Sequence, residues 1–226
     1  MLNRFRTEGP QAFDARHLIA MELRARLADI PRSPLDWSAF EITVSHLAAF
    51  ERLLCDAAAR TAELRALWRE SVLTAAFARR LAPRMRGDAR LSAIAGLLHR
   101  LGDMLTIRAI GEIEYTAHIR LDAASKADLC AVHGGEQLER TVRAWGVPPR
   151  AAATAAEWRR LREFPAAAAD AAAVYLARLF AIELIAPQFC VPGVVDASIE
   201  EAGLDAAALC DIRGDATIKS LLSELQ

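Results

Sequence analysis

The chain has 226 residues, of which 54% are hydrophobic and 25% are charged, the balance of an ordinary globular protein. A chain of this length buries on the order of 70% of its unfolded surface, so it needs neither disulfides nor a metal ion to fold. Its 28 basic and 29 acidic side chains leave a net charge of −1, which disfavours binding to nucleic acid because there is no bulk attraction to phosphate.

The composition favours helices over strands. Ala, Leu and Arg are in excess over Val, Ile, Tyr and Thr, and the first group has the higher helix propensity. No internal repeat or low-complexity linker divides the chain. We therefore expect one all-α domain over residues 1–226, with N-terminal helices in 1–39, a core in 40–186, and a connector with C-terminal helices in 187–226.

Four widely spaced cysteines, Cys55, Cys130, Cys190 and Cys210, predict free buried thiols in a reducing cytoplasm. Cys130 and His133 have a zinc-like spacing, but no second ligand pair accompanies them, so a structural zinc site is disfavoured. We expect no cofactor.

The longest apolar run, residues 166–186, is interrupted by Asp170, Arg178 and Glu183. Charges at those depths are costly in a bilayer, so the run is interpreted as a buried helix, and no membrane association is expected.

In chain order, the spacing of Phe13, Leu18, Met21 and Leu27 predicts a first helix that ends before Pro31. The segment Ser33-Pro34-Leu35-Asp36 offers a capping residue, a proline and an acid, which together predict the start of a second helix. The apolar face of that helix would contain Trp37, Phe40, Val44, Leu47 and Ala48.

A helical period continues from Phe50 to Met85, with a break near Thr61 and an end at Pro83. The pairs Arg79-Arg80 and Arg159-Arg160 lie on expected helices. A solvated face is the simplest interpretation of both pairs, and we assign them no function.

The central predicted helix begins after Gly87-Asp88 and has Leu91, Ile94, Leu98, Leu101 and Leu105 on one face. It places His99 and Arg100 at the edge of the core. The apolar period continues to Ile107, so Gly102 is expected to mark close packing or a kink rather than the end of the helix.

Residues 122–128 are expected to form a loop, followed by a helix that ends at Trp145-Gly146. Gly134-Gly135 inside this helix predicts close approach of another backbone. Two helices over 150–162 and 166–186, an extended connector over 191–195, and terminal helices over 204–212 and 217–225 complete the chain.

Several of these segments together resemble a known family. Leu97-Leu98-His99-Arg100-Leu101-Gly102 is similar to the central signature of the HD superfamily, and the order of Leu67–Ser71, His133 and Trp145–Pro148 around it resembles the HDOD branch, the HD-related output domain of bacterial signalling proteins. The resemblance covers roughly residues 40–185 and implies a compact HD-like helical bundle. Residues 1–39 lack the family's N-terminal segments and are diverged.

The resemblance also places the metal-binding positions of HD enzymes. In this sequence they are Glu70, His99, Arg100 and Arg178, and only His99 has the expected residue type. A guanidinium beside the expected ion repels it, so the metal site is predicted to be degenerate and the chain to be non-catalytic. The resemblance further implies that His133 lies near His99.

Two interpretations of these positions remain open. Glu70 and Arg100 would form a charge-assisted pair where the metal lies in relatives, with His99 and His133 as hydrogen-bonding neighbours. Alternatively, both charged side chains simply reach solvent.

The leading functional hypothesis is a regulatory or interaction module in bacterial signal transduction that binds an unidentified signalling protein, with homodimer formation left open. One alternative is a divergent phosphohydrolase or phosphodiesterase acting on nucleotides or cyclic dinucleotides through Glu70, His99 and His133. The other is a sensor of a small anionic ligand such as a nucleotide, built on Arg100, Arg178 and the histidines. The sequence contains no other catalytic motif.

Overall fold

The computed structural model describes residues 10–54, 62–158, 165, 168–191 and 193–224. Every regular element within these residues is a helix, which confirms the predicted all-α class. The helices are α1 (Pro10–Ala28), α2 (Val44–Leu54), α3 (Ala62–Leu81), η2 (Ala82–Met85), α4 (Ala89–Leu98), α5 (Leu101–Ala117), α6 (Ala123–Ala144), α7 (Pro149–Glu157), α8 (Ala169–Ile185), η4 (Pro187–Phe189), α9 (Val194–Glu201), α10 (Ala206–Gly214) and α11 (Ala216–Glu224).

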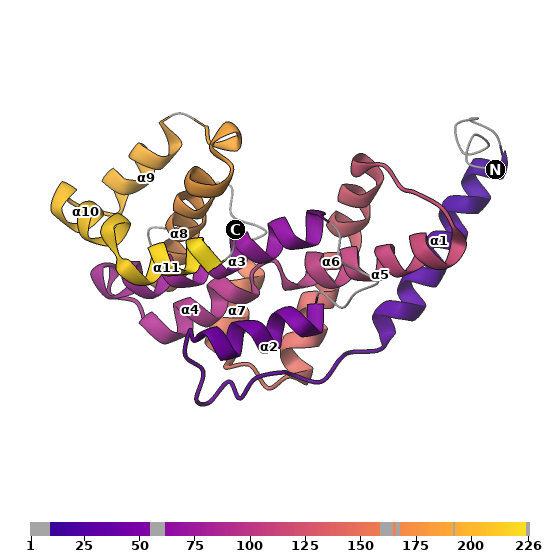
Figure 1. Ribbon diagram of the computed structural model, residues 1–226, viewed down its shortest axis with the longest axis horizontal. Helices are drawn as coiled ribbons and strands as arrows, with labels where there is room; N and C mark the ends of the chain where they lie inside the picture. The colour runs from indigo at the N-terminus through magenta and orange to yellow at the C-terminus, as the bar shows by residue number, and fades with distance from the viewer. Residues whose placement is uncertain (1–9, 55–61, 159–164, 166–167, 192, 225–226) are drawn as a thin grey trace.

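Helix α3 lies at the centre of the molecule, where it packs most extensively against α8 and α4. Helix α5 pairs with α6, and α1 lies along α5 at one end of the molecule (Figure 1). Helices α9, α10 and α11 gather with α8 at the opposite end (Figure 1). Of the helices predicted to bear the site, α4 and α8 therefore pack against α3, whereas α6 packs against α5.

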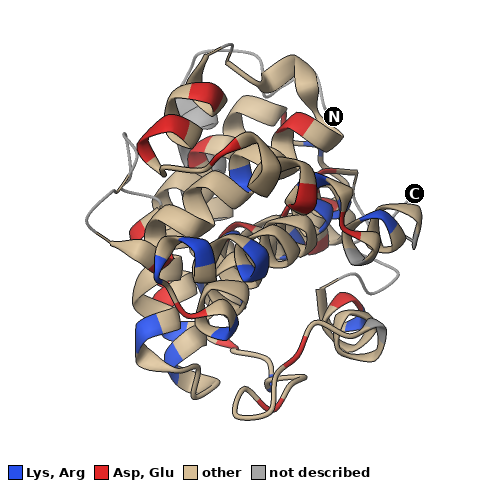
Figure 2. Cartoon of the chain, turned by 90° about the vertical axis from the view of Figure 1, so that its left-hand side faces the viewer, with Lys and Arg blue, Asp and Glu red and all other residues tan. Residues whose placement is uncertain are grey.

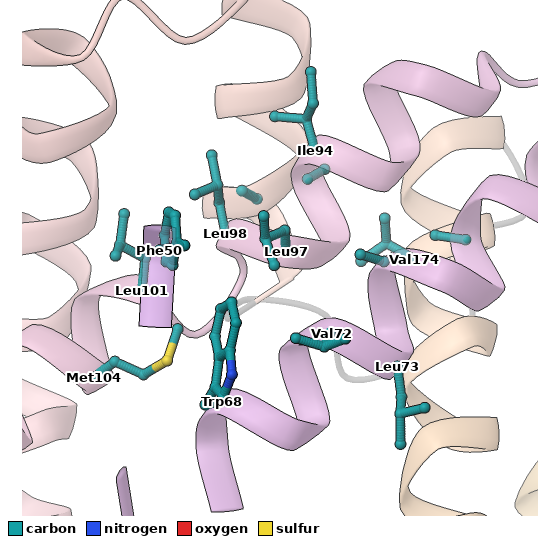
Figure 3. Packing of buried hydrophobic residues seen from close by; sticks show 14 of the residues in the cluster. Phe50, Trp68, Val72, Leu73, Ile94, Leu97, Leu98, Leu101, Met104 and Val174 are labelled. Carbon is teal, nitrogen blue, oxygen red and sulfur yellow. The ribbon is translucent and has the colours of Figure 1, made fainter. Parts of the chain in front are cut away.

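The apolar face of α3 forms the middle of the core (Figure 3). Trp68 and Val72 lie close to Leu97 of α4, and the Phe50 ring stacks on Trp68 with centroids 5.4 Å apart. Both α3 side chains and Leu97 are buried. Each large apolar side chain removed from water in this way contributes about 1.5–3 kcal/mol.

The two glycines that flank the central signature each allow another backbone to approach. A Cβ on Gly96 would lie 2.9 Å from Cα of Ala75 in α3, and one on Gly102 would lie 1.8 Å from the carbonyl oxygen of Gly134 in α6. The predicted close packing at Gly102 and Gly134 is confirmed. These contacts hold the segment between the glycines against α3 on one side and α6 on the other.

A buried carboxylate fixes the start of α8. Asp170 accepts hydrogen bonds from the backbone N–H of Asp88 at 2.7 Å and from Oγ of Ser92 at 3.1 Å, and it pairs with Arg150 Nε at 2.5 Å. These partners belong to the beginnings of α4 and α7. Asp170 therefore sets the position of α8 relative to α4, and with it the position of Arg178 about two turns further along.

The prediction of a helix that starts at Ser33 is wrong, because residues 30–43 are irregular and α2 begins only at Val44. Local side-chain hydrogen bonds replace the helical ones: the Ser33 hydroxyl donates to the Leu35 carbonyl at 2.8 Å, and Asp36 Oδ1 accepts from the Ser38 backbone N–H at 2.9 Å. Arg90 donates to the carbonyls of Trp37 and Ser38, which a helix would use itself.

The central helix is also not continuous. It divides into α4 and α5 at His99 and Arg100, and the Trp158 indole N–H donates to the carbonyl of His99 at the break. The kink predicted near Gly102 therefore falls two residues earlier. The carbonyl of His99 thus accepts a hydrogen bond from a side chain distant in the sequence.

Two segments predicted as irregular are helical. Helix α6 already begins at Ala123, because the Asp122 side chain caps it by accepting from the Ser125 backbone N–H at 2.7 Å. Val194 and Val195 belong to α9 rather than to an extended connector, with Gly193 at φ 81° as the residue before it. The two terminal helices agree with α10 and α11 to within two residues.

Of the cysteines, Cys130 and Cys190 are partly buried and Cys210 is exposed, so the expectation of buried thiols is wrong for Cys210. Cys55 and the pair Arg159-Arg160 lie outside the described residues. No helix in the described part of the chain is both long and apolar enough to cross a membrane.

Candidate functional site

The candidate site begins with Glu70, which α3 presents toward the end of α4. Its side chain is only 15% exposed. The Thr74 hydroxyl donates to the Glu70 carbonyl at 2.7 Å, and the close approach of α3 and α4 at Gly96 brings the carboxylate to His99. Glu70 is therefore a partly buried acid next to the end of α4 and not a solvated surface residue.

His99 lies at the end of α4 and is 1% exposed. Its Nδ1 lies 2.6 Å from the carbonyl oxygen of Gly96, and its Nε2 lies 3.4 Å from Oε1 of Glu70. Because a carbonyl oxygen only accepts, Nδ1 carries a proton. Burial lowers the pKa of His99, although the hydrogen bond and charge of Glu70 oppose that shift.

Arg178 of α8 supplies the strongest contact to Glu70. Its Nε lies 2.8 Å from Oε1 of Glu70, which is the geometry of a charge-assisted hydrogen bond. Burial by itself would raise the pKa of Glu70, but the hydrogen bond and charge of His99, together with Arg178 and Arg100, outweigh burial and lower that pKa to about 2. Since a guanidinium stays protonated, Arg178 neutralises Glu70 at every relevant pH.

Arg100 does not pair with Glu70. Its Nε lies 3.2 Å from Oδ2 of Asp103, one turn further along the chain. The hypothesis of a Glu70–Arg100 pair is therefore wrong, because Glu70 pairs with Arg178 and Arg100 pairs with Asp103. The opposing interpretation, that both side chains simply reach solvent, is wrong for Glu70 as well.

Trp158 is the residue of this cluster that sequence reasoning missed. Its ring centroid lies 5.0 Å from that of His99, edge to face, and the guanidinium carbons of Arg100 and Arg178 lie 5.2 and 4.8 Å from the Trp158 ring. Cation–π contacts of this kind contribute about 0.5–2 kcal/mol each. One aromatic side chain at the end of α7 therefore connects α4, α5 and α8.

His133 is separate from the cluster. It is buried on α6, and its charged neighbours are Arg24 and Glu136. Burial, and after it the charge of Arg24, lowers the pKa of His133. Helix α6 does approach the central segment at Gly102, but among the described residues no hydrogen bond or ring contact joins His133 to His99.

The donor set of the cluster consists of one carboxylate and one imidazole, Glu70 and His99, next to two guanidinium groups. In the described part of the chain, no group of three or more His, Cys, Asp or Glu side chains is arranged to hold a metal ion. The arrangement is suited to charge neutralisation within the protein.

The fold and the site define a helical domain in which buried His99 and partly buried Glu70 meet at the junction of two helices. The family model of the HDOD domain matches residues 43–159, which is more than half of the chain, and the chain belongs to this family. No curated protein and no solved structure shows a significant match. The matched segment ends just after Trp158, so it is shorter than the predicted resemblance and leaves Arg178 outside.

Proposed function

We propose that this chain is a non-catalytic regulatory module of bacterial signal transduction, which acts in the cytoplasm by binding another signalling protein. Membership of the HDOD family supports a signalling-associated role. The observation that carries the non-catalytic part is the 2.8 Å contact between Arg178 and Glu70. A permanent cation sits on the one carboxylate of the cluster, so that carboxylate is not free to bind a second cation.

The residues present do not fit the metal ion that HD enzymes use. A divalent ion that activates water needs several neutral imidazoles and carboxylates, whereas the matching positions hold Glu70, His99, Arg100 and Arg178. Two guanidinium groups within a partly buried cluster would repel the ion strongly. The site therefore lacks the ligand set for metal-assisted hydrolysis.

Metal analysis tests the proposal. Purified protein is incubated with manganese, iron or zinc, desalted, and assayed by elemental mass spectrometry. Wild-type protein is expected to retain well below one metal ion per chain, while the restored variant Glu70→His/Arg100→Asp/Arg178→Asp is expected to retain more. Near-stoichiometric metal in wild-type protein that is lost in His99→Ala would overturn the proposal and support the phosphohydrolase alternative.

One observation favours the anion-sensor alternative. The side chains of Arg100 and Arg178 are 22% and 28% exposed, and both stack on Trp158. Against this alternative, each guanidinium already has a carboxylate partner. A thermal-shift screen with phosphate, nucleotides and cyclic dinucleotides distinguishes the two roles: a ligand-dependent shift that Arg100→Ala abolishes would favour the sensor.

A further inference from the structure

A pocket lies between α3, α8 and α11 and shares no described lining residue with the Glu70–Arg178 cluster. Its volume is about 360 Å³, which is within the range of roughly 300–1,000 Å³ that small-molecule sites occupy. The described side chains that line it are the apolar Phe77, Phe180, Leu184, Ile218 and Leu222 and the charged Glu183, Arg213 and Lys219. An apolar lining with a few charged groups is typical of a ligand site.

The inner walls of the pocket are fixed parts of the core. Phe77 and Phe180 contact each other edge to face with centroids 5.6 Å apart, and each is only 2% exposed. Ile218 of α11 is also buried. Asp215 holds the start of α11, because it accepts a hydrogen bond from the Ile218 backbone N–H at 3.3 Å and pairs with Arg80. A ligand therefore finds the pocket formed and need not displace α10 or α11.

The outer side of the pocket is accessible to solvent. Leu184 is 46% exposed, and Lys219 is exposed as well, in contrast to the aromatic floor of Phe77 and Phe180. Covering an exposed apolar side chain is favourable, because it removes apolar surface from water. The mouth of the pocket therefore combines apolar surface with a cation.

The charged side chains around the pocket leave this cation without a partner. Arg213 Nη2 lies 2.7 Å from Oε2 of Glu183, and the Arg213 guanidinium lies 5.2 Å from the centroid of the Phe180 ring. Arg213 and Glu183 therefore neutralise each other at the edge of the aromatic floor. Within the described part of the chain, the Lys219 ammonium makes no ion pair. Charges of both signs are interspersed over the helices at this end of the molecule (Figure 2), so Lys219 sets the charge at the mouth.

We propose that this pocket binds an amphiphilic monocarboxylate of the medium-chain fatty acid class. The alkyl chain lies on Phe77 and Phe180, and the carboxylate pairs with Lys219. Burial of the chain removes apolar surface from water, and the carboxylate forms a charge-assisted hydrogen bond with the ammonium. The inference goes beyond the proposed function, because every described lining residue except Phe77 lies outside the segment that matches the HDOD family.

The lining of the pocket disfavours other classes of ligand. A nucleotide or a sugar would bring many polar atoms against apolar side chains, and buried polar atoms without partners are costly. A divalent cation needs free carboxylates, whereas Glu183 is paired with Arg213. The volume is near the lower end of the range for ligand sites, which favours one short alkyl chain over a lipid with two long chains.

The test is isothermal titration calorimetry of the full chain with butanoate, hexanoate and octanoate, each below its critical micelle concentration. Octanoate is expected to bind at a single site per chain. The affinity is expected to rise about fourfold for each added methylene that becomes buried.

Variants locate the binding site. Lys219→Gln is expected to weaken octanoate binding about fivefold, the effect of an exposed charge pair, and to leave the binding of uncharged octanol unchanged. Lys219→Arg restores a cation and is expected to restore the affinity for octanoate. Leu222→Trp fills the pocket and is expected to abolish the binding of both compounds. Arg120→Gln removes an exposed cation between α5 and α6; it is the matched control and is expected to change neither.

Three results would overturn the inference. They are the absence of saturable octanoate binding to the wild type, an unchanged octanoate affinity in Lys219→Gln, and octanoate binding that survives filling of the pocket. Circular dichroism verifies that each variant folds, and Leu184→Trp, at an exposed position, fills the pocket if Leu222→Trp does not fold. The metal analysis probes a different site, so the regulatory role stands or fails independently of these titrations.

Discussion

The contact between Arg178 and Glu70 allows a quantitative prediction. The pKa of Glu70 falls from 4.5 to about 2, which at 1.36 kcal/mol per pKa unit corresponds to ~3 kcal/mol in favour of the anion. His99, Arg178 and Arg100 share this effect, and the Arg178 side chain is 28% exposed. We therefore expect a coupling free energy of about 1–2 kcal/mol between Glu70 and Arg178.

The assay is a double-mutant cycle with Glu70→Gln, Arg178→Ala and the double variant, measured by urea unfolding at pH 7 and followed by far-ultraviolet circular dichroism. A second cycle with Arg100→Ala is the control. Arg100 is paired with Asp103, so its coupling to Glu70 is expected to stay below about 0.5 kcal/mol. Coupling near zero for Arg178, or larger coupling for Arg100, would refute the assigned pairing.

Three further predictions follow from the structure. Because folding lowers the pKa of Glu70, the stability that Glu70 contributes is complete above about pH 4.5 and is lost as the pH falls toward about 2. The free energy of unfolding, measured in urea across this range, should therefore fall less steeply with decreasing pH in Glu70→Gln than in the wild type. Equal slopes for the two proteins would contradict this. Gly102→Ala drives a Cβ to 1.8 Å from a carbonyl of α6 and should destabilise the protein by about 2 kcal/mol or more, whereas Gly214→Ala, with nothing within 4 Å, should not. Burial raises the pKa of Cys130 to about 11, so alkylation followed by peptide mass spectrometry should label it more slowly than exposed Cys210; equal rates would count against the burial.

The sequence predicted those parts of the fold that depend on apolar periodicity, whereas local capping signals failed at Ser33 and were underestimated at Asp122. The apolar spacing around Leu98 predicted helical structure through this segment but not its division into α4 and α5, and Gly134 correctly predicted the close approach of another backbone. The helix predicted to start at residues 33–36 does not form. Local hydrogen bonds of Ser33 and Asp36, together with the distant side chain of Arg90, occupy backbone groups that a helix would use. Distant donors of this kind leave no signal in a local window.

The same limit applies to the candidate site. Family resemblance brought Glu70, His99 and Arg178 to notice, and the structure brings these three together. The resemblance could not decide which arginine pairs with Glu70, because that pairing depends on how α8 crosses α3. Trp158 was missed since a single tryptophan near a helix end is equally typical of core packing.

The cluster at the junction of α4 and α5 also has a consequence for folding kinetics. The hydrogen bonds of the cluster join residues whose separations along the chain are 29, 59 and 108 positions. Contacts between such distant positions form late in folding because long loops must close first. Interactions that are absent from the transition state govern the rate of unfolding rather than that of folding. The cluster is therefore expected to act as a kinetic barrier to opening, which lengthens the lifetime of the native state without hastening its formation.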